Sequence, residues 1–359
     1  MQIPFYDPAK TYDENSASGP FGGFADDEIL EFSGEPNFNF CGEKIFAPFG
    51  IPAGPLPNAN FCAAAFRKNF CLPVYKTVRT GAQKCNGFPN IFPVDAGKNL
   101  SLERAAAGIF TKKNFDEKNL AITNSFGVPS LDPKIWQPDM QRAVKSARRG
   151  QILIASFQGT NRGDGEKKFI DDHILGAQLC AETGAKILEM NLSCPNEGKK
   201  KLLCHDTDLV EKISDKIKNK IGNLPLFLKI SFFENDEILR DFISRLGKIV
   251  DGFSAINTIP AKIFNEKKLP ALGVGREISG VCGAPIKWAG LEMTKKIAKI
   301  RADEKLNFKI IGVGGITNFT DFLEFKNAGA DAAMSATGAM WNTNLGAEIA
   351  ENWRKNFQN

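Results

Sequence analysis

Hydrophobic and polar positions follow two alternating periods from about residue 150 onward. Short runs of apolar, mostly β-branched residues are each followed by a stretch with the 3.6-residue spacing of a helix. The apolar runs are QILIASF, KILEMNLS, PLFLKIS, DGFSAINT, FKIIGVGGI and DAAMSATG. Helices are predicted near 168–183, 207–221, 236–249, 287–301, 318–328 and 344–356. This alternation predicts a parallel sheet covered by helices.

The first part of the chain adds two strands. FGIPAG and PVYKTV are apolar runs separated by the helix-like stretch ANFCAAAFRKNF. Eight strand–helix units are the number that closes a (β/α)8 TIM barrel. The stretch 79–150 does not read as one helix and predicts an elaborated loop between strands two and three. We therefore expect one barrel domain over 46–359, preceded by an N-terminal extension over 1–45 that packs outside it.

Composition and charge restrict location and partners. The net charge of +5 is mild for 359 residues and gives no evidence for a nucleic-acid partner. No apolar run approaches the roughly 20 residues of a membrane span. The N-terminal stretch MQIPFYDPAKTYDENSASG lacks the basic start and apolar core of a signal peptide. We expect a cytoplasmic protein without a membrane partner.

Cysteine and histidine usage predicts no metal site. None of the eight cysteines forms a C-x-x-C pair, so the spacing predicts neither an iron–sulfur cluster nor structural zinc. His173 and His205 are the two histidines. With so little histidine, acid–base chemistry near neutral pH must fall to other groups.

The predicted strand ends carry a coherent set of polar residues and glycines. Active sites of (β/α)8 barrels form at these carboxyl ends. A lysine there needs a negative or hydrogen-bonding partner, and an asparagine suits a planar ligand with C=O and N–H edges. GVGGITN and SATG, on the last two strands, stand where barrels hold phosphate, although a glycine pair also makes an ordinary tight turn. The strand-end residues are Ala53, Gly54, Lys76, Thr77, Gln158, Asn191, Lys229, Asn257, Thr258, Gly314, Gly315, Thr337 and Gly338.

Cys194 directly follows the fourth predicted strand, within NLSCPNEGKK. A cysteine is ordinarily an inert small apolar residue. Its neighbours Asn191, Ser193 and Asn196 are polar, and lysines stand nearby, which would favour a thiolate able to take a proton. Spacing alone leaves both interpretations open.

Six motifs, in order, resemble the dihydroorotate dehydrogenase family over roughly residues 48–345. They are YKT, NSFGVP, NLSCPNEGKK with LLCHD, INT, ISGVCGAPIK and GVGGI. They look most like the soluble class whose base is cysteine. The resemblance implies an FMN-containing (β/α)8 barrel that oxidises dihydroorotate to orotate in de novo pyrimidine biosynthesis. It also implies a homodimer.

The resemblance assigns roles to individual residues. Cys194 would remove the C5 proton of dihydroorotate while the C6 hydride passes to N5 of FMN. The residues implied for the substrate are Lys76, Asn124, Phe126, Gly127, Val128, Asn191, Asn196, Asn257 and Thr258. Those implied for FMN are Ala53, Gly54, Lys76, Thr77, Asn124, Asn191, Lys229, Gly280, Gly283, Gly314, Gly315, Thr337 and Gly338.

Other FMN barrels and a non-catalytic flavoprotein remain as alternatives. The catalytic domain of dihydropyrimidine dehydrogenase shares an NLSCP motif but takes uracil or thymine, which lack the carboxylate. A tRNA dihydrouridine synthase needs an RNA-binding surface, and no dense basic cluster stands near the C-terminus. For the electron acceptor, PNEGKK and LLCHD favour the fumarate-using group. NAD with a separate electron-transfer subunit stays open, whereas a cysteine at position 194 disfavours a quinone.

Overall fold

Eight parallel strands close into a barrel in the computed structural model, which describes residues 3–193 and 202–357. Each strand corresponds to one of the predicted apolar runs, and β15 pairs with β3 to complete the circle. The predicted (β/α)8 barrel is therefore confirmed. The strands are β3 (Phe49–Ile51), β4 (Leu72–Val78), β8 (Ile154–Phe157), β9 (Ile187–Asn191), β10 (Leu226–Ile230), β11 (Gly252–Ala255), β14 (Lys309–Val313) and β15 (Ala332–Met334).

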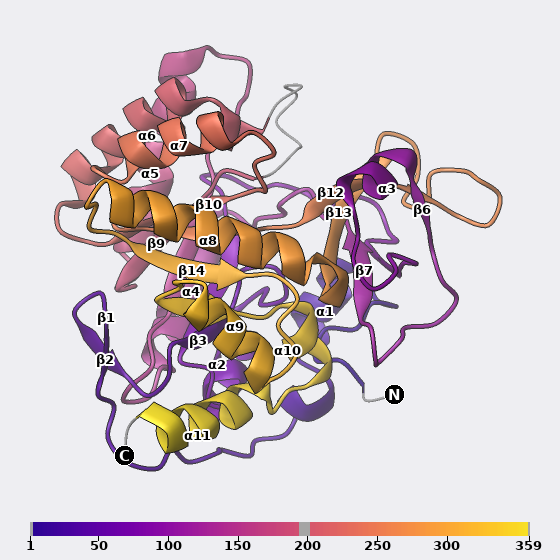
Figure 1. Ribbon diagram of the computed structural model, residues 1–359, viewed down its shortest axis with the longest axis horizontal. Helices are drawn as coiled ribbons and strands as arrows, with labels where there is room; N and C mark the ends of the chain where they lie inside the picture. The colour runs from indigo at the N-terminus through magenta and orange to yellow at the C-terminus, as the bar shows by residue number, and fades with distance from the viewer. Residues whose placement is uncertain (1–2, 194–201, 358–359) are drawn as a thin grey trace.

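Helices between the strands cover the outside of the barrel (Figure 1). They form where apolar residues recur on one face, as in α6, which buries Leu209, Ile213 and Ile217 and ends at Gly222 with φ 61°. No helix of the described residues is long and apolar enough to cross a membrane. The helices are α2 (Ala59–Arg67), α4 (Pro133–Lys145), α5 (Glu166–Ala181), α6 (Thr207–Ile221), α7 (Asp236–Leu246), α8 (Lys287–Asp303), α9 (Phe319–Asn327), α10 (Thr337–Trp341) and α11 (Leu345–Phe357).

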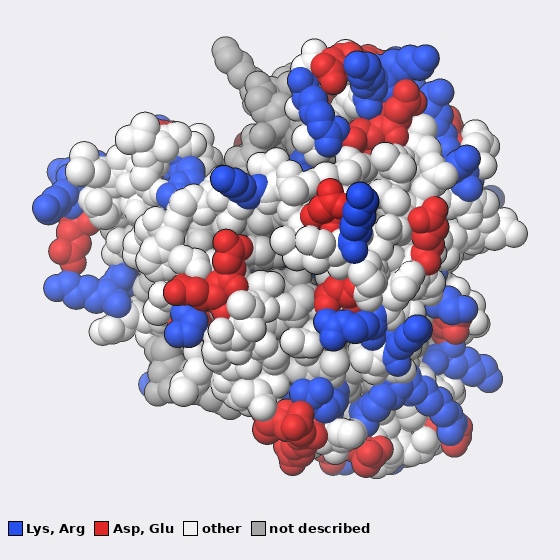
Figure 2. Space-filling view, turned by 180° about the vertical axis from the view of Figure 1, so that it is seen from behind, with Lys and Arg blue, Asp and Glu red and all other residues white. Residues whose placement is uncertain are grey.

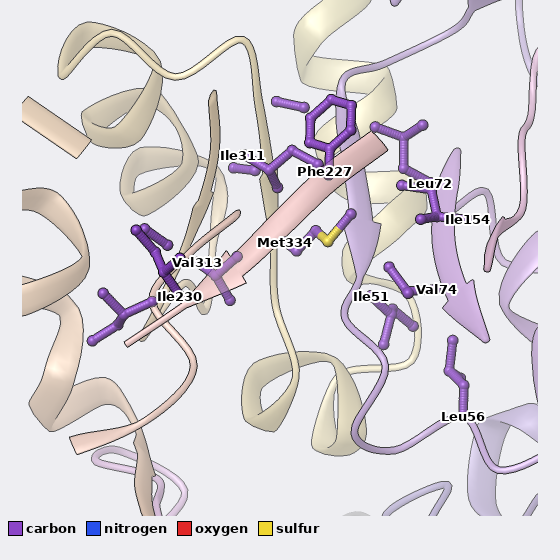
Figure 3. Packing of buried hydrophobic residues seen from close by; sticks show 14 of the residues in the cluster. Ile51, Leu56, Leu72, Val74, Ile154, Phe227, Ile230, Ile311, Val313 and Met334 are labelled. Atoms are coloured by element: carbon purple, nitrogen blue, oxygen red, sulfur yellow. The ribbon is translucent and has the colours of Figure 1, made fainter. Parts of the chain in front are cut away.

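The core is apolar and closed at the amino ends of the strands. Figure 3 shows side chains that the barrel strands contribute to it, among them Ile51, Phe227 and Met334, all fully buried. A short hairpin, β1 (Phe38–Phe40) and β2 (Glu43–Ile45), precedes the first barrel strand. Phe40 of this hairpin lies 5.9 Å from the Phe227 ring, near the start of β10, so the hairpin covers this end of the barrel.

A second sheet stands beside the barrel (Figure 1, right). Its order is β5-β7-β13-β12-β6. Part of it, with a short helix and α4, comes from the stretch 79–150, which is therefore more regular than the predicted loop. The remainder comes from the connection between β11 and α8. Its elements are β5 (Ile91–Pro93), α3 (Leu102–Ala107), β6 (Ile109–Phe110), β7 (Ala121–Asn124), β12 (Ile259–Phe264) and β13 (Ile278–Gly283).

The first described residues pack against the end of the chain as well as against α2. They include α1 (Tyr12–Ser18), which begins with a capping box between Thr11 and Glu14, and the short helix η1 (Gly22–Phe24). The Phe5 N–H donates to the Met340 carbonyl of α10 at 3.0 Å. The segment therefore reaches the side of the barrel where the strands end.

Candidate active site

A cavity of about 240 Å³ opens at the carboxyl ends of the barrel strands, next to the second sheet. All but two of the residues implied for catalysis, substrate or cofactor line it; Cys194 and Asn196 lie outside the described residues. Gln158 does not line the cavity but bonds to a residue that does. The lining residues singled out from the sequence are Ala53, Gly54, Lys76, Thr77, Asn124, Phe126, Gly127, Val128, Asn191, Lys229, Asn257, Thr258, Gly280, Gly283, Gly314, Gly315, Thr337 and Gly338.

A chain of side-chain hydrogen bonds fixes the amides on one wall. Asn191 Nδ2 donates to Gln158 Oε1 at 3.0 Å, and Asn191 Oδ1 accepts from the Ser193 hydroxyl at 2.9 Å. The Ser193 hydroxyl in turn accepts from Asn257 Nδ2 at 2.7 Å. Because each group orients the next, the two asparagines are positioned before a ligand arrives. Ser193 was missed as a site residue, although it stands beside Asn191 in the NLSC motif.

Lys229 presents a buried amino group to the cavity. Its side chain is 5% exposed, and Nζ has no hydrogen-bond partner among the described residues. Burial lowers the pKa of Lys229, and the negative charge of Glu189, on the neighbouring strand β9, opposes that shift. A buried polar group without a partner is costly, so this lysine indicates a ligand that supplies the missing acceptor.

Two glycine-containing loops meet where the last two strands end. Gly314 and Gly315 follow β14 with φ values of 137° and 73°, which side-chain-bearing residues rarely adopt. A Cβ on Gly315 would lie 2.7 Å from Lys287 Cβ. Ser335 Oγ donates to the Ile316 carbonyl at 2.6 Å and ties this loop to the one that leads into α10. The arrangement suits a phosphate group.

The loop 124–128 is held in an unusual backbone conformation. Gly127 and Val128 have φ values of 75° and 50°, and a β-branched residue at positive φ is a conformational outlier. Arg79 Nε donates to the Val128 carbonyl at 3.1 Å, and the Asn86 N–H donates to the Phe126 carbonyl at 2.9 Å. Such strain persists only when neighbours enforce it, and it is commonly found at functional sites.

Gly127→Ala is expected to lower the free energy of unfolding by about 1–2 kcal/mol. The new Cβ would lie 2.6 Å from Asn86 Oδ1, at a φ that alanine disfavours. Gly87→Ala is the control, since a Cβ there meets nothing within 4 Å. Urea unfolding of the two variants measures the difference. Equal stabilities would show that the conformation at Gly127 is not under strain.

Cys282 is a thiol at the cavity that the sequence analysis did not single out. Its Sγ accepts hydrogen bonds from Asn124 Nδ2 at 3.6 Å and from Thr337 Oγ1 at 3.4 Å. Burial raises the pKa of Cys282, so it stays protonated near neutral pH and is a poor base. The two-residue period of a strand would have found it, because Gly280 and Cys282 face the same side of β13.

Comparison with known proteins identifies the family. Residues 37–352 match the family described as dihydroorotate dehydrogenase. The dihydroorotate dehydrogenase of Dictyostelium discoideum is 32% identical over 371 residues, covering 99% of this chain and 98% of that protein. A subunit of the NAD-dependent dihydropyrimidine dehydrogenase of Escherichia coli K12 is 27% identical over 319 residues, 85% of this chain and 68% of that one.

The fold resembles that of a solved DHODH structure. A crystal structure of the Eimeria tenella enzyme DHODH in complex with ferulenol superposes with a TM-score of 0.70 at 21% identity. The superposition covers 91% of this chain and 87% of that one. At this identity the likeness concerns the fold alone. The sequence match over nearly the whole length does more: this chain belongs to the dihydroorotate dehydrogenase family.

Proposed function

We propose that the protein oxidises dihydroorotate to orotate in de novo pyrimidine biosynthesis, with FMN as its cofactor. The observation that carries this proposal is the meeting of one lysine and three asparagines, Lys76, Asn124, Asn191 and Asn257, in one cavity of a chain of this family. Amides offer donors and acceptors to the ring N–H and C=O groups of a pyrimidine. The lysine offers a positive charge to the carboxylate of dihydroorotate.

The donor set at the cavity fits FMN. Lys229 Nζ is a buried donor without a partner among the described residues, as an electron-rich ring edge requires. The loops at Gly314–Gly315 and Thr337–Gly338 suit the phosphate, and a Cβ on Gly54 would meet nothing within 4 Å, which leaves room for a planar ring. FMN, when bound there, would supply the acceptor for the hydride of C6 of dihydroorotate.

The chain's own residues then have the task of holding the substrate and moving a proton. Asn124, Asn191 and Asn257 would hold the ring amides, and Lys76 the carboxylate. Cys194 would take the proton from C5, so that the C5–C6 double bond forms as both hydrogens leave. Two observations support this role of Cys194. One is the NLSCPN motif, and the other is that the neighbouring Ser193 lines the cavity and forms hydrogen bonds with Asn191 and Asn257.

Anaerobic titration of the purified protein with dihydroorotate is expected to bleach the flavin absorbance. Dihydrouracil, which lacks the carboxylate, should leave the spectrum unchanged and serves as the control. A yellow protein that dihydroorotate does not bleach would contradict the substrate but not the cofactor. A colourless protein that cannot take up FMN would contradict both.

Two other FMN barrels give different outcomes in the same experiment. The likeness to the Escherichia coli dihydropyrimidine dehydrogenase subunit makes uracil-type substrates the second candidate, and bleaching by dihydrouracil would favour it. A tRNA-modifying role would need a basic surface. On the face in Figure 2, Lys and Arg are interspersed with Asp and Glu rather than gathered in one area.

The electron acceptor and the assembly belong to the same proposal. Fumarate should reoxidise the bleached protein, whereas NAD should not do so without a further electron-transfer subunit. We also propose that the protein is a cytoplasmic homodimer. Acceptor assays, cell fractionation and analytical ultracentrifugation test these three statements separately.

A further inference from the structure

Tyr6, in the segment that precedes the barrel, contributes a buried hydroxyl to the cavity lining. It lines the cavity and is 2% exposed. Its hydroxyl has no hydrogen-bond partner among the described residues. Buried hydroxyls are nearly always paired, so an unpaired one on a residue that lines a ligand cavity indicates a partner that arrives with the ligand.

The backbone on both sides of Tyr6 is fixed. Phe5 donates to the Met340 carbonyl at 3.0 Å and accepts from the Phe21 N–H at 2.9 Å. On the other side, the Asp7 N–H donates to Asn15 Oδ1 at 2.8 Å, and Asn15 Nδ2 returns a bond to the Asp7 carbonyl at 2.9 Å. Asn15 is fully buried, so this clamp is shielded from water. The position of Tyr6 is therefore set before a ligand binds.

The Tyr6 ring is fixed by aromatic contacts. It meets the Phe126 ring edge-on, with centroids 5.9 Å apart and an interplanar angle of 87°, and lies 6.4 Å from Phe61. Phe126 belongs to the strained loop 124–128, whose residues line the cavity where we place the substrate. Burial raises the pKa of Tyr6 far above neutral, so its hydroxyl remains a hydrogen-bond donor at any working pH.

We propose that Tyr6 is a substrate-binding residue whose hydroxyl donates a hydrogen bond to a carbonyl or carboxylate oxygen of the pyrimidine. The contact with Phe126 places it beside the substrate loop rather than beside the Gly314–Gly315 loop. This inference rests on the proposed function and deepens it. It makes the segment before the barrel a wall of the active site.

Tyr6→Phe removes one oxygen and keeps the ring contacts with Phe126 and Phe61. We expect about tenfold weaker orotate binding and an equal rise in the KM for dihydroorotate. FMN content should stay at the wild-type level, and kcat should change by less than about threefold, because uniform binding is lost. The apoprotein should melt no lower than wild type, since no bond within the protein is removed.

Tyr12→Phe is the matched control. Tyr12 also packs on Phe126, with centroids 6.1 Å apart, but it does not line the cavity. We expect wild-type orotate affinity for this variant.

Three results would overturn the assignment of Tyr6. The assignment would be wrong if Tyr6→Phe bound orotate as tightly as wild type, if it lost FMN instead of orotate, or if it melted clearly lower than wild type. A wild-type protein that binds no orotate would overturn the proposed function, and the assignment with it. Binding by wild type with no change in the variant would overturn the assignment alone.

Discussion

Cys194→Ala is expected to slow the bleaching of the flavin by dihydroorotate by about 10²–10⁴-fold, the usual contribution of a general base. Loss of the C6 hydride requires loss of the C5 proton, and alanine cannot accept it. Neither histidine lines the cavity, and Nδ1 of the buried His173 lies 2.9 Å from the Phe169 carbonyl. FMN and orotate should still bind, because the amides and lysines that hold them are unchanged. Stopped-flow absorbance under anaerobic conditions measures the rate.

Cys282→Ala is the control that distinguishes the loss of a base from the loss of a cysteine thiol in general. Cys282 is protonated near neutral pH, because burial raises its pKa, and it accepts bonds from Asn124 and Thr337. Its loss removes these two long hydrogen bonds to sulfur, which should disturb the position of Asn124 and slow bleaching by no more than about tenfold. Equal slowing in both variants, or a wild-type rate in Cys194→Ala, would contradict the assignment of Cys194.

The barrel could be predicted from the sequence because its signals are local. Each strand is a short apolar run followed by a stretch with helical periodicity, so each strand–helix unit can be recognised within about 30 residues. The second sheet has no such signal. Thr123 of β7 pairs with Val281 of β13, far apart in the chain, and both strands are short. Periodicity says little about strands whose partners lie this far away.

Some residues of the candidate site could likewise be predicted from local sequence patterns, and others could not. Lys76, Asn191 and Lys229 could be found because they lie at or within two residues of the ends of their strands. Glu189, two residues before Asn191, lines the same cavity and could have been found from the two-residue period of β9. Arg79 and Tyr6 could not, because only the folded chain brings Arg79 to the Val128 carbonyl and Tyr6 to Phe126. The role of Cys194 stays a prediction, since that residue lies outside the described ones.

Lys229→Met is expected to weaken FMN binding by about 100-fold. The substitution removes one charge-assisted hydrogen bond, whose loss costs about 3 kcal/mol of binding free energy. Methionine keeps most of the buried volume but offers no donor. The buried ammonium has no other partner among the described residues, so bound FMN supplies its acceptor in this proposal. Quenching of FMN fluorescence on binding measures the affinity. FMN should also raise the melting temperature of the variant less than that of wild type.

Lys68→Met is the control for Lys229→Met. It shows whether an effect on FMN binding comes from the position of the lysine in the cavity or from the loss of any buried lysine. Lys68 is 2% exposed, like Lys229, but its ammonium is paired with Asp26 and Glu28, each at 2.8 Å, away from the cavity. Its replacement should lower the melting temperature and leave the FMN affinity of the folded protein unchanged. If both variants lost FMN affinity equally, the effect would come from general destabilisation. If Lys229→Met bound FMN like wild type, the proposed contact between Lys229 and the cofactor would be wrong.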